Sequence, residues 1–262
     1  MPFIASNKLL FHCEWNGPED APVLVLSNSL GTNLSLWDPQ IPAFEKNFRV
    51  LRYDSRGHGK SGVTLHDYSV EQLARDVLGL LDALTLDRVH FCGLSIGGMT
   101  GMWLAAHAPE RLNKLILANT SPQIGNAQAW NARILAVRSA ASTKSVALSV
   151  VERWFTPEFR AKNPDAVAKT KEMIESTNPD GYMASCAAVR DFNFWPEVAA
   201  IHAPTLFIAG THDAAVPPAD VQRLAREIPG AKCIELDAAH ISNIEAAEQF
   251  TSEVSTFLLA SA

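Results

Sequence analysis

Short apolar runs alternate with amphipathic stretches along most of the chain. The run at residues 23–26 is continuously apolar, which is typical of a strand that is covered on both faces, and further apolar runs occur at 88–92 and 204–210. Residues 69–86 instead carry apolar side chains at spacings of three and four, the stripe of an amphipathic helix. Strands that alternate with helices at this interval predict an α/β fold with a mostly parallel, doubly wound sheet.

The remaining elements follow the same pattern. The segments 8–15 and 22–28 flank a turn-forming stretch at 16–20, and we expect them to pair as a hairpin. Further strands are predicted at 49–54, 114–119 and 232–236, and further helices at 99–106, 219–228 and 242–259.

The alternation stops between residues 121 and 201. Stretches there read as helices, and no strand interrupts them; they lie at 132–141, 145–154, 166–176 and 181–190. A helical insertion between two strands predicts a cap over the carboxyl ends of the strands, where such sheets bind ligands. The expected division is a core of residues 1–120 and 202–262 with a helical cap at 121–201. The alternative is that these helices only extend the core.

Composition and charge narrow the function classes. No apolar run approaches the roughly 18 residues that span a bilayer, and residues 1–8 lack a secretory signal, so we expect a cytoplasmic protein without a membrane partner. The net charge of −6 and the lack of a basic cluster argue against a nucleic-acid partner. The four cysteines, Cys13, Cys92, Cys186 and Cys233, have no metal-site spacing, and we interpret them as reduced structural residues. No metal site is predicted.

A glycine-rich segment at 55–62 matches G-x-G-x-x-G, but no helix opens directly after it, as dinucleotide binding requires. We expect this segment to be structural. His58 is predicted to be a structural residue of this segment, and Arg56 to pair with a carboxylate. Asp54, which directly precedes the segment, is predicted to bind the amides of its turn.

The pentapeptide Gly93-Leu94-Ser95-Ile96-Gly97 follows a predicted strand and precedes a predicted helix. A G-x-S-x-G in this context is the nucleophile-elbow signature, in which small flanking residues let the backbone lift the serine hydroxyl above the sheet. Ser95 is therefore the candidate nucleophile.

Two further residues follow predicted strands in an informative order. Asp213 comes after the strand at 204–210 and His240 after the strand at 232–236, so the chain order is Ser, Asp, His. This is the order of α/β-hydrolases and differs from that of other serine-hydrolase folds. His240 would take the Ser95 proton, and Asp213 would hold the imidazole. Taken singly, His240 could be a core or capping histidine and Asp213 a helix N-cap; His212 is expected to be an exposed neighbour.

An oxyanion hole needs two N–H donors. The N–H of Ile96 at the start of the elbow helix is one candidate, and that of Leu30, in the loop after the strand at 23–27, is the other.

Together these motifs resemble the α/β-hydrolase superfamily over nearly the whole chain, and most closely its 3-oxoadipate enol-lactonases. The resemblance is carried by Ser29-Leu30-Gly31-Thr32, Tyr53-Asp54-Ser55-Arg56-Gly57-His58-Gly59, Gly93-Leu94-Ser95-Ile96-Gly97-Gly98, Gly210-Thr211-His212-Asp213 and Ala239-His240. One departure is Asn28-Ser29, where many members carry His-Gly. The resemblance implies opening of an enol-lactone in aromatic catabolism, with neither a cofactor nor a metal.

The substrate of that family bears a carboxylate, which an arginine fork would match in a protein of net charge −6. The predicted cap offers Arg133, Arg138, Arg153, Arg160 and Arg190. We expect Arg133, Trp130 and Trp154 to line the substrate pocket, although each arginine has the alternative of a solvated face. Alternative functions are a general carboxylesterase or other small-ester hydrolase, and a non-catalytic small-molecule receptor. The sequence does not determine the oligomeric state.

Overall fold

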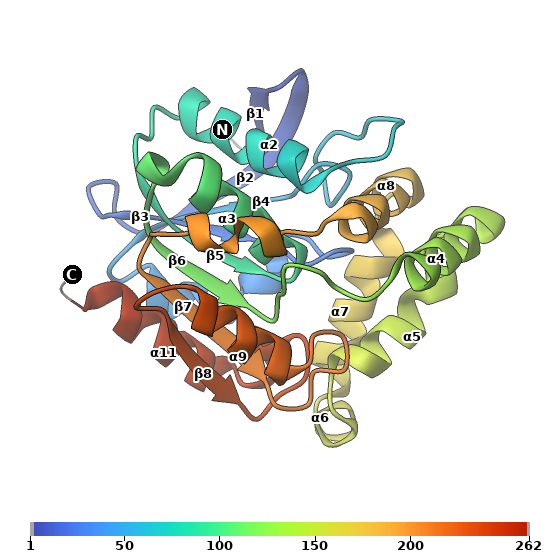
Figure 1. Cartoon of the computed structure of the whole chain (residues 1–262). Helices are drawn as coiled ribbons and strands as arrows, with labels where there is room; N and C mark the ends of the chain where they lie inside the picture. Colours follow the sequence, from blue (N-terminus) through green and yellow to red (C-terminus); the bar gives the residue numbers. More distant parts are fainter. Residues whose placement is uncertain (1–2, 261–262) are drawn as a thin grey trace.

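The computed structural model describes residues 3–260 and contains an eight-stranded sheet (Figure 1). The strands are β1 (Phe3–Ser6), β2 (Leu9–Asn16), β3 (Val23–Ser27), β4 (Arg49–Tyr53), β5 (Val89–Leu94), β6 (Leu112–Ala118), β7 (Thr205–Gly210) and β8 (Lys232–Leu236). Their order across the sheet is β1-β2-β4-β3-β5-β6-β7-β8. The six strands from β4 to β8 in this order pair in parallel, which confirms the predicted α/β class.

The predicted N-terminal hairpin is wrong. β2 does not pair with β3; it pairs antiparallel with β1 on one side and with β4 on the other. The apolar residues of β3 explain the difference, because four of its five residues are buried and it lies between two parallel neighbours. A strand of this kind belongs in the middle of a sheet, so proximity in the sequence did not predict its partner.

Two groups of helices cover the sheet (Figure 1). The first includes α2 (Val70–Ala83), α3 (Ile96–His107) and α9 (Pro218–Glu227); the second includes α1 (Ile41–Phe44) and α11 (Ala247–Leu259). The predicted helix at 242–259 is divided at Ala246 into α10 (Ser242–Glu245) and α11. Short 3₁₀ helices occur at Leu34–Trp37, Pro109–Arg111 and Trp195–Ala200.

The longer helices are those that the apolar spacing predicted, with shifted ends, whereas α1 and a short helix at Pro157–Lys162 were not predicted. In α2 the buried positions follow the expected stripe, and Ser69 caps the helix by accepting from the N–H of Gln72 at 3.1 Å. α3 is different, because ten of its twelve residues are buried. A helix that is apolar all round lies inside the molecule, and this one supports the residue that precedes it, Ser95.

Five helices lie between β6 and β7 and project beyond the sheet on the right of Figure 1. They are α4 (Ala127–Ala140), α5 (Lys144–Trp154), α6 (Pro157–Lys162), α7 (Pro164–Ser176) and α8 (Pro179–Asp191), which we call the helical cap. α4 packs against α5 and α8, and α5 against α7. The 3₁₀ helix at Trp195–Ala200 instead contacts α3 and α9. The residues of the predicted core at 1–2 and 261–262 lie outside the described residues.

Within residues 3–260 no helix has both the length and the apolarity to cross a membrane. The cysteines are unpaired, as predicted. Cys13, Cys92 and Cys186 are buried, whereas Cys233 in the edge strand β8 is exposed.

Candidate active site

The parallel register brings five strand ends to one edge of the sheet. Ser27 lies beside Gly93, Leu94 beside Ala118, Ala118 beside Ile208, and Gly210 beside Leu236. The loops that carry Leu30, Ser95, Asp213 and His240 begin at these ends. Residues more than 100 positions apart in the sequence therefore meet above one edge.

Ser95 stands at a sharp turn between β5 and α3. Its backbone has φ 58° and ψ −117°, a conformation that non-glycine residues rarely adopt. The turn is possible because its flanks have no side chain: a Cβ on Gly93 would lie 2.2 Å from the carbonyl oxygen of Gly97, and one on Gly97 would lie 2.3 Å from that of Ser27. This is the strained strand-to-helix geometry of a nucleophile elbow.

His240 and Asp213 form a buried pair beside this turn. The Nδ1 atom of His240 lies 2.8 Å from Oδ2 of Asp213, and both residues are at most 4% exposed. The other carboxylate oxygen of Asp213 accepts from the backbone N–H groups of Ala215 at 2.8 Å and Val216 at 2.9 Å. The carboxylate thus holds the imidazole so that its second nitrogen, Nε2, is available to another group.

The surroundings of Asp213 favour its charged form. Burial by itself raises the pKa of this carboxyl group, but the charge of His240 and the hydrogen bonds from His240, Val216 and Asn119 outweigh burial and lower the pKa below its usual value. Asp213 is therefore an anion that can stabilise an imidazolium ion at its side.

Ser95 and His240 line one small cavity of about 150 Å³ below the helical cap. No hydrogen bond joins their side chains in the part of the chain that the structure describes, a common situation before substrate is bound. The indole of Trp154 lies over His240, with ring centroids 5.7 Å apart. The cavity size is that of a small organic molecule rather than a long chain.

The two predicted oxyanion donors lie on either side of the elbow, one in a loop that lines the cavity and one at the start of α3. Leu30 lines the cavity, and Ile96 is the first residue of α3, directly after Ser95. Among residues 3–260, neither backbone N–H donates to an acceptor. Two unoccupied donors next to a serine hydroxyl can stabilise an oxyanion.

The structure places all three predicted substrate-binding residues on the cavity wall. Trp130 and Arg133 come from α4, and the guanidinium carbon of Arg133 lies 4.7 Å from the ring centre of Trp130. Trp154 is the last residue of α5. Arg153 also lines the cavity, which the sequence analysis did not single out from the other cap arginines.

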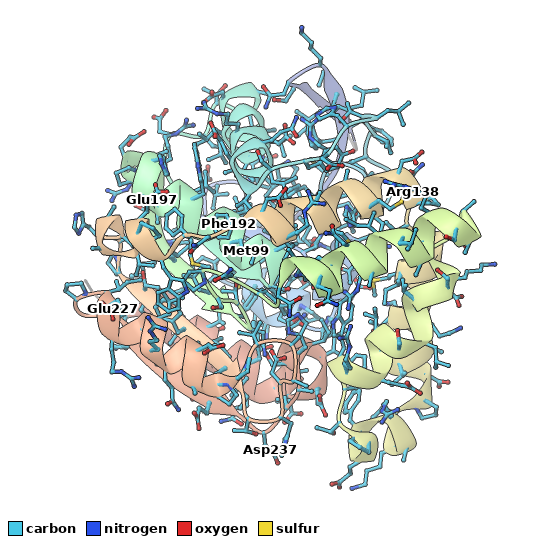
Figure 2. The ribbon with its side chains drawn as sticks, turned by 45° about the vertical axis from the view of Figure 1, so that its right-hand side comes forward. Met99, Arg138, Phe192, Glu197, Glu227 and Asp237 are labelled. Carbon is cyan, nitrogen blue, oxygen red and sulfur yellow. The ribbon has the colours of Figure 1, made fainter. Side chains whose placement is uncertain are left out.

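Arg133 and Arg153 differ from the other candidate arginines. In the described part of the chain no carboxylate lies within 4.0 Å of either guanidinium, whereas Arg190 pairs with Asp191 at 2.7 Å. Arg138, Arg160 and Arg190 do not line the cavity. Figure 2 shows Arg138 near the C-terminal end of α4. It lies well away from Asp237, which belongs to the loop after β8 that also carries His240. Arg133 and Arg153 are thus the cations available to an anionic ligand.

Two residues that the sequence analysis missed connect the catalytic candidates to their surroundings. Asn119 follows β6, and its side-chain amide donates to Oδ2 of Asp213 at 3.0 Å and to the carbonyl of Ala239 at 3.1 Å. A polar residue directly after an apolar strand was the available signal.

Glu245 connects the helical cap to the loop that carries His240. Its Oε1 atom accepts from the N–H of Thr156 at 3.0 Å and from the Thr156 hydroxyl, and its Oε2 atom accepts from the N–H of Ala239 at 2.9 Å. The carbonyl of Trp154 accepts from the N–H of Ile241 at 3.2 Å in the same region. No sequence signal distinguished Glu245, which is half-buried, from the other carboxylates of the last helices.

The glycine-rich segment has the structural role that was predicted. Asp54 accepts from the N–H of Lys60 at 2.9 Å, and Arg56 pairs with Asp76 at 2.6 Å. His58 is buried and accepts from the N–H of Gly31 at 2.9 Å, while burial lowers its pKa. His212 is exposed, as expected, and pairs with Asp237 at 2.8 Å. No group of three or more metal-ligating side chains occurs among the described residues.

Comparison with known proteins agrees with this geometry. The model of the alpha/beta hydrolase fold family matches residues 22–247. The chain is 42% identical over 238 residues to 3-oxoadipate enol-lactonase 2 of Acinetobacter baylyi, covering 91% of this chain and 89% of that protein.

Two solved structures share this fold over nearly the whole chain. The enol-lactonase from Burkholderia xenovorans LB400 superposes with a TM-score of 0.97 at 44% identity, covering 99% of this chain and all of that one. A thermophilic esterase from Thermogutta terrifontis (malate bound) superposes with a TM-score of 0.91 at 26% identity, covering 98% of this chain and 97% of that one.

Proposed function

The chain belongs to the α/β-hydrolase family, and on that premise we propose that it hydrolyses the ring ester of 3-oxoadipate enol-lactone to give 3-oxoadipate. It is an ester hydrolase, and its substrate is a small lactone. One observation supports the proposal most: a serine on a strained elbow and the histidine of a buried histidine–aspartate pair line one small cavity. The wall of this cavity also holds two arginines that have no carboxylate partner within residues 3–260.

In the first half of the reaction, Ser95 Oγ attacks the lactone carbonyl while Nε2 of His240 takes its proton. The negative charge moves to the carbonyl oxygen, where the N–H groups of Leu30 and Ile96 stabilise it. Collapse of the tetrahedral intermediate breaks the ring C–O bond. The leaving enolate takes the proton from His240 and tautomerises to the ketone, so the product is an acyl-enzyme with a ketone in its chain.

In the second half, His240 removes a proton from a water molecule, which attacks the acyl carbon. The second tetrahedral intermediate uses the same two donors, and its collapse returns the proton to Ser95 and releases the carboxylic acid. Asp213 stays ionised throughout and stabilises the imidazolium form of His240 through the 2.8 Å contact with Nδ1.

The carboxylate of the lactone is proposed to bind Arg133. This residue belongs to α4 and lines the same cavity as Ser95. Its planar fork matches a carboxylate, and Trp130 holds the guanidinium in place by stacking. Trp154 lies beside His240 on the cavity wall and gives the substrate an apolar contact surface.

A general carboxylesterase is the second candidate, because a solved esterase shares the fold with a TM-score of 0.91. The test is the ratio of kcat/KM for the enol-lactone and for p-nitrophenyl esters of similar size. We expect a large preference for the lactone, and comparable values would favour the general esterase. A serine-directed phosphonate followed by mass mapping is expected to label Ser95, and labelling at another residue would contradict the nucleophile assignment.

A further inference from the structure

Two buried threonine hydroxyls bind the peptide groups that carry the two oxyanion donors. The hydroxyl of Thr32 donates to the carbonyl oxygen of Ser29 at 2.8 Å, and the hydroxyl of Thr120 donates to the carbonyl oxygen of Ser95 at 2.7 Å. Thr32 is 1% exposed and Thr120 is fully buried. The carbonyl of Ser29 shares its peptide group with the N–H of Leu30, as the carbonyl of Ser95 does with the N–H of Ile96.

A peptide group is planar and trans, so its C=O and N–H bonds point in opposite directions. A partner that holds the carbonyl therefore also sets the direction of the N–H. Backbone groups contribute at both places, because the N–H of Thr32 donates to Ser29 at 3.2 Å and that of Met99 to Ser95 at 3.0 Å. At each carbonyl the bond from the threonine hydroxyl is shorter than the bond from the backbone N–H. Both threonines lie in loops, outside the helices and strands.

Each carbonyl has one backbone partner, which for Ser95 is the first hydrogen bond of α3, and the threonine hydroxyl is the second partner at each place. The Ser29 peptide belongs to a loop with a positive φ of 78° at Gly31, and the Ser95 peptide follows the strained elbow residue. Strained backbone of this kind persists only where the surrounding structure holds it in place. A hydrogen bond to the carbonyl also polarises the amide and makes its N–H a better donor, an effect of about 10–30% per bond.

We propose that Thr32 and Thr120 are positioning residues of the oxyanion hole, which hold the N–H groups of Leu30 and Ile96 toward the reacting carbonyl and strengthen them as donors. The proposal rests on the proposed hydrolytic function of this site. The two residues come from separate loops, after β3 and after β6, and each acts on one donor. Neither hydroxyl touches substrate; each acts through the peptide that it binds.

The test replaces each hydroxyl with a methyl group in T32V and T120V, which keep the shape of the side chain. Removing an oxyanion donor outright lowers kcat by about 10²–10³, so a donor that is misdirected is expected to lose part of this, about 10-fold in kcat with KM nearly unchanged. The Ki of n-butylboronic acid, whose serine adduct is tetrahedral, should rise by a similar factor. T32S and T120S, which keep the hydroxyl, should restore both constants.

The matched control is T205V. Thr205 is 1% exposed and its hydroxyl donates to the carbonyl of Ala203 at 2.7 Å, a similar bond at the other end of the sheet. T205V should keep the wild-type kcat and Ki, although its thermal midpoint will fall as in the other two variants. If a valine variant does not fold, the cysteine variant replaces it, because a thiol is a weak donor and the same loss is expected.

Two results would overturn the inference: valine variants with the kcat and boronate Ki of T205V, or serine variants that lose as much as the valine ones. Both differ from a failure of the proposed function. If S95A retained the hydrolysis of the wild type, the site itself would be misassigned, whatever the threonine variants do.

Discussion

Replacement of Arg133 with methionine tests how the cavity selects its substrate. Arg133 is half-buried on the cavity wall, has no carboxylate partner in the described structure and stacks on Trp130 at 4.7 Å. Methionine keeps much of the length and apolar volume of the side chain but removes the charge and all five donors. The binding of the substrate carboxylate should weaken, while the geometry of the elbow and of the His240–Asp213 pair stays intact.

The size of the effect follows from the type of bond that is lost. A hydrogen bond to a charged group contributes about 1.5–3 kcal/mol, so the loss of this contact should lower kcat/KM by about 10- to 150-fold. Most of the change should be in KM, because the carboxylate does not change its charge during ring opening and binds the ground state and the transition state alike. The loss of stacking on Trp130, about 0.5–1 kcal/mol, is a separate contribution to stability.

The assay separates these two contributions with a second substrate. An enol-lactone that carries a methyl group in place of the carboxylate arm cannot use the guanidinium, so R133M should hydrolyse it at nearly the wild-type rate. R138M is the control, because Arg138 lies outside the cavity on the same helix. Equal losses on both substrates would refute the reasoning, since they would show a packing effect. A carboxylate-specific loss in R153M and not in R133M would move the anchor to Arg153.

Three further predictions concern the acid, the cap and the response to pH. D213N should keep the fold and lower kcat by about 10⁴, because an amide favours the wrong imidazole tautomer; steady-state kinetics check this, and a loss below tenfold would contradict the role of Asp213. E245Q should lower the free energy of unfolding by about 1–3 kcal/mol, since its amide faces either the donors of Thr156 or that of Ala239; urea unfolding measures this, with E248Q at the exposed Glu248 as the control. Burial lowers the pKa of His90 from 6.5 to about 4, and the nearby charges of Lys114 and Arg88 add to the effect. Between pH 4 and pH 6.5 the unfolded chain therefore binds a proton at His90 that the folded chain does not bind. Stability contributed by neutral His90 is therefore complete above pH 6.5 and falls toward pH 4, and urea unfolding at pH 7 and pH 5 should show a smaller decrease for H90F than for the wild type.

The predictability of the site varies from residue to residue. Ser95, Asp213 and His240 each follow an apolar strand, and their order in the chain is specific, so the sequence indicated where they meet. Their assignment as catalytic residues stays a prediction for the experiments above. The predicted hairpin between residues 8–15 and 22–28 was wrong, because local turn signals do not show which strands pair across a sheet.

The cap shows the same limit for binding residues. Trp130, Arg133 and Trp154 were expected on the cavity wall and lie there, but Arg153 was one of five similar arginines in the sequence. Its position beside the cavity depends on how α5 packs on its neighbours. Glu245 was equally inconspicuous. Its partner Thr156 lies far away in the sequence, and its bond to Ala239 is to a backbone N–H, which the sequence does not identify.

The sequence by itself determined the order of the longer helices and of every strand except β1, the elbow around Ser95 and the candidates for acid and base, because these depend on periodicity and on glycines at fixed offsets. Only the tertiary structure decided which strands pair, which arginines reach the cavity, and that Thr32 and Thr120 bind the carbonyls opposite the Leu30 and Ile96 N–H groups. The physical reason is that a hydrogen bond depends on direction as well as on composition. The direction of a peptide group in a loop is set by contacts between segments that the sequence keeps apart.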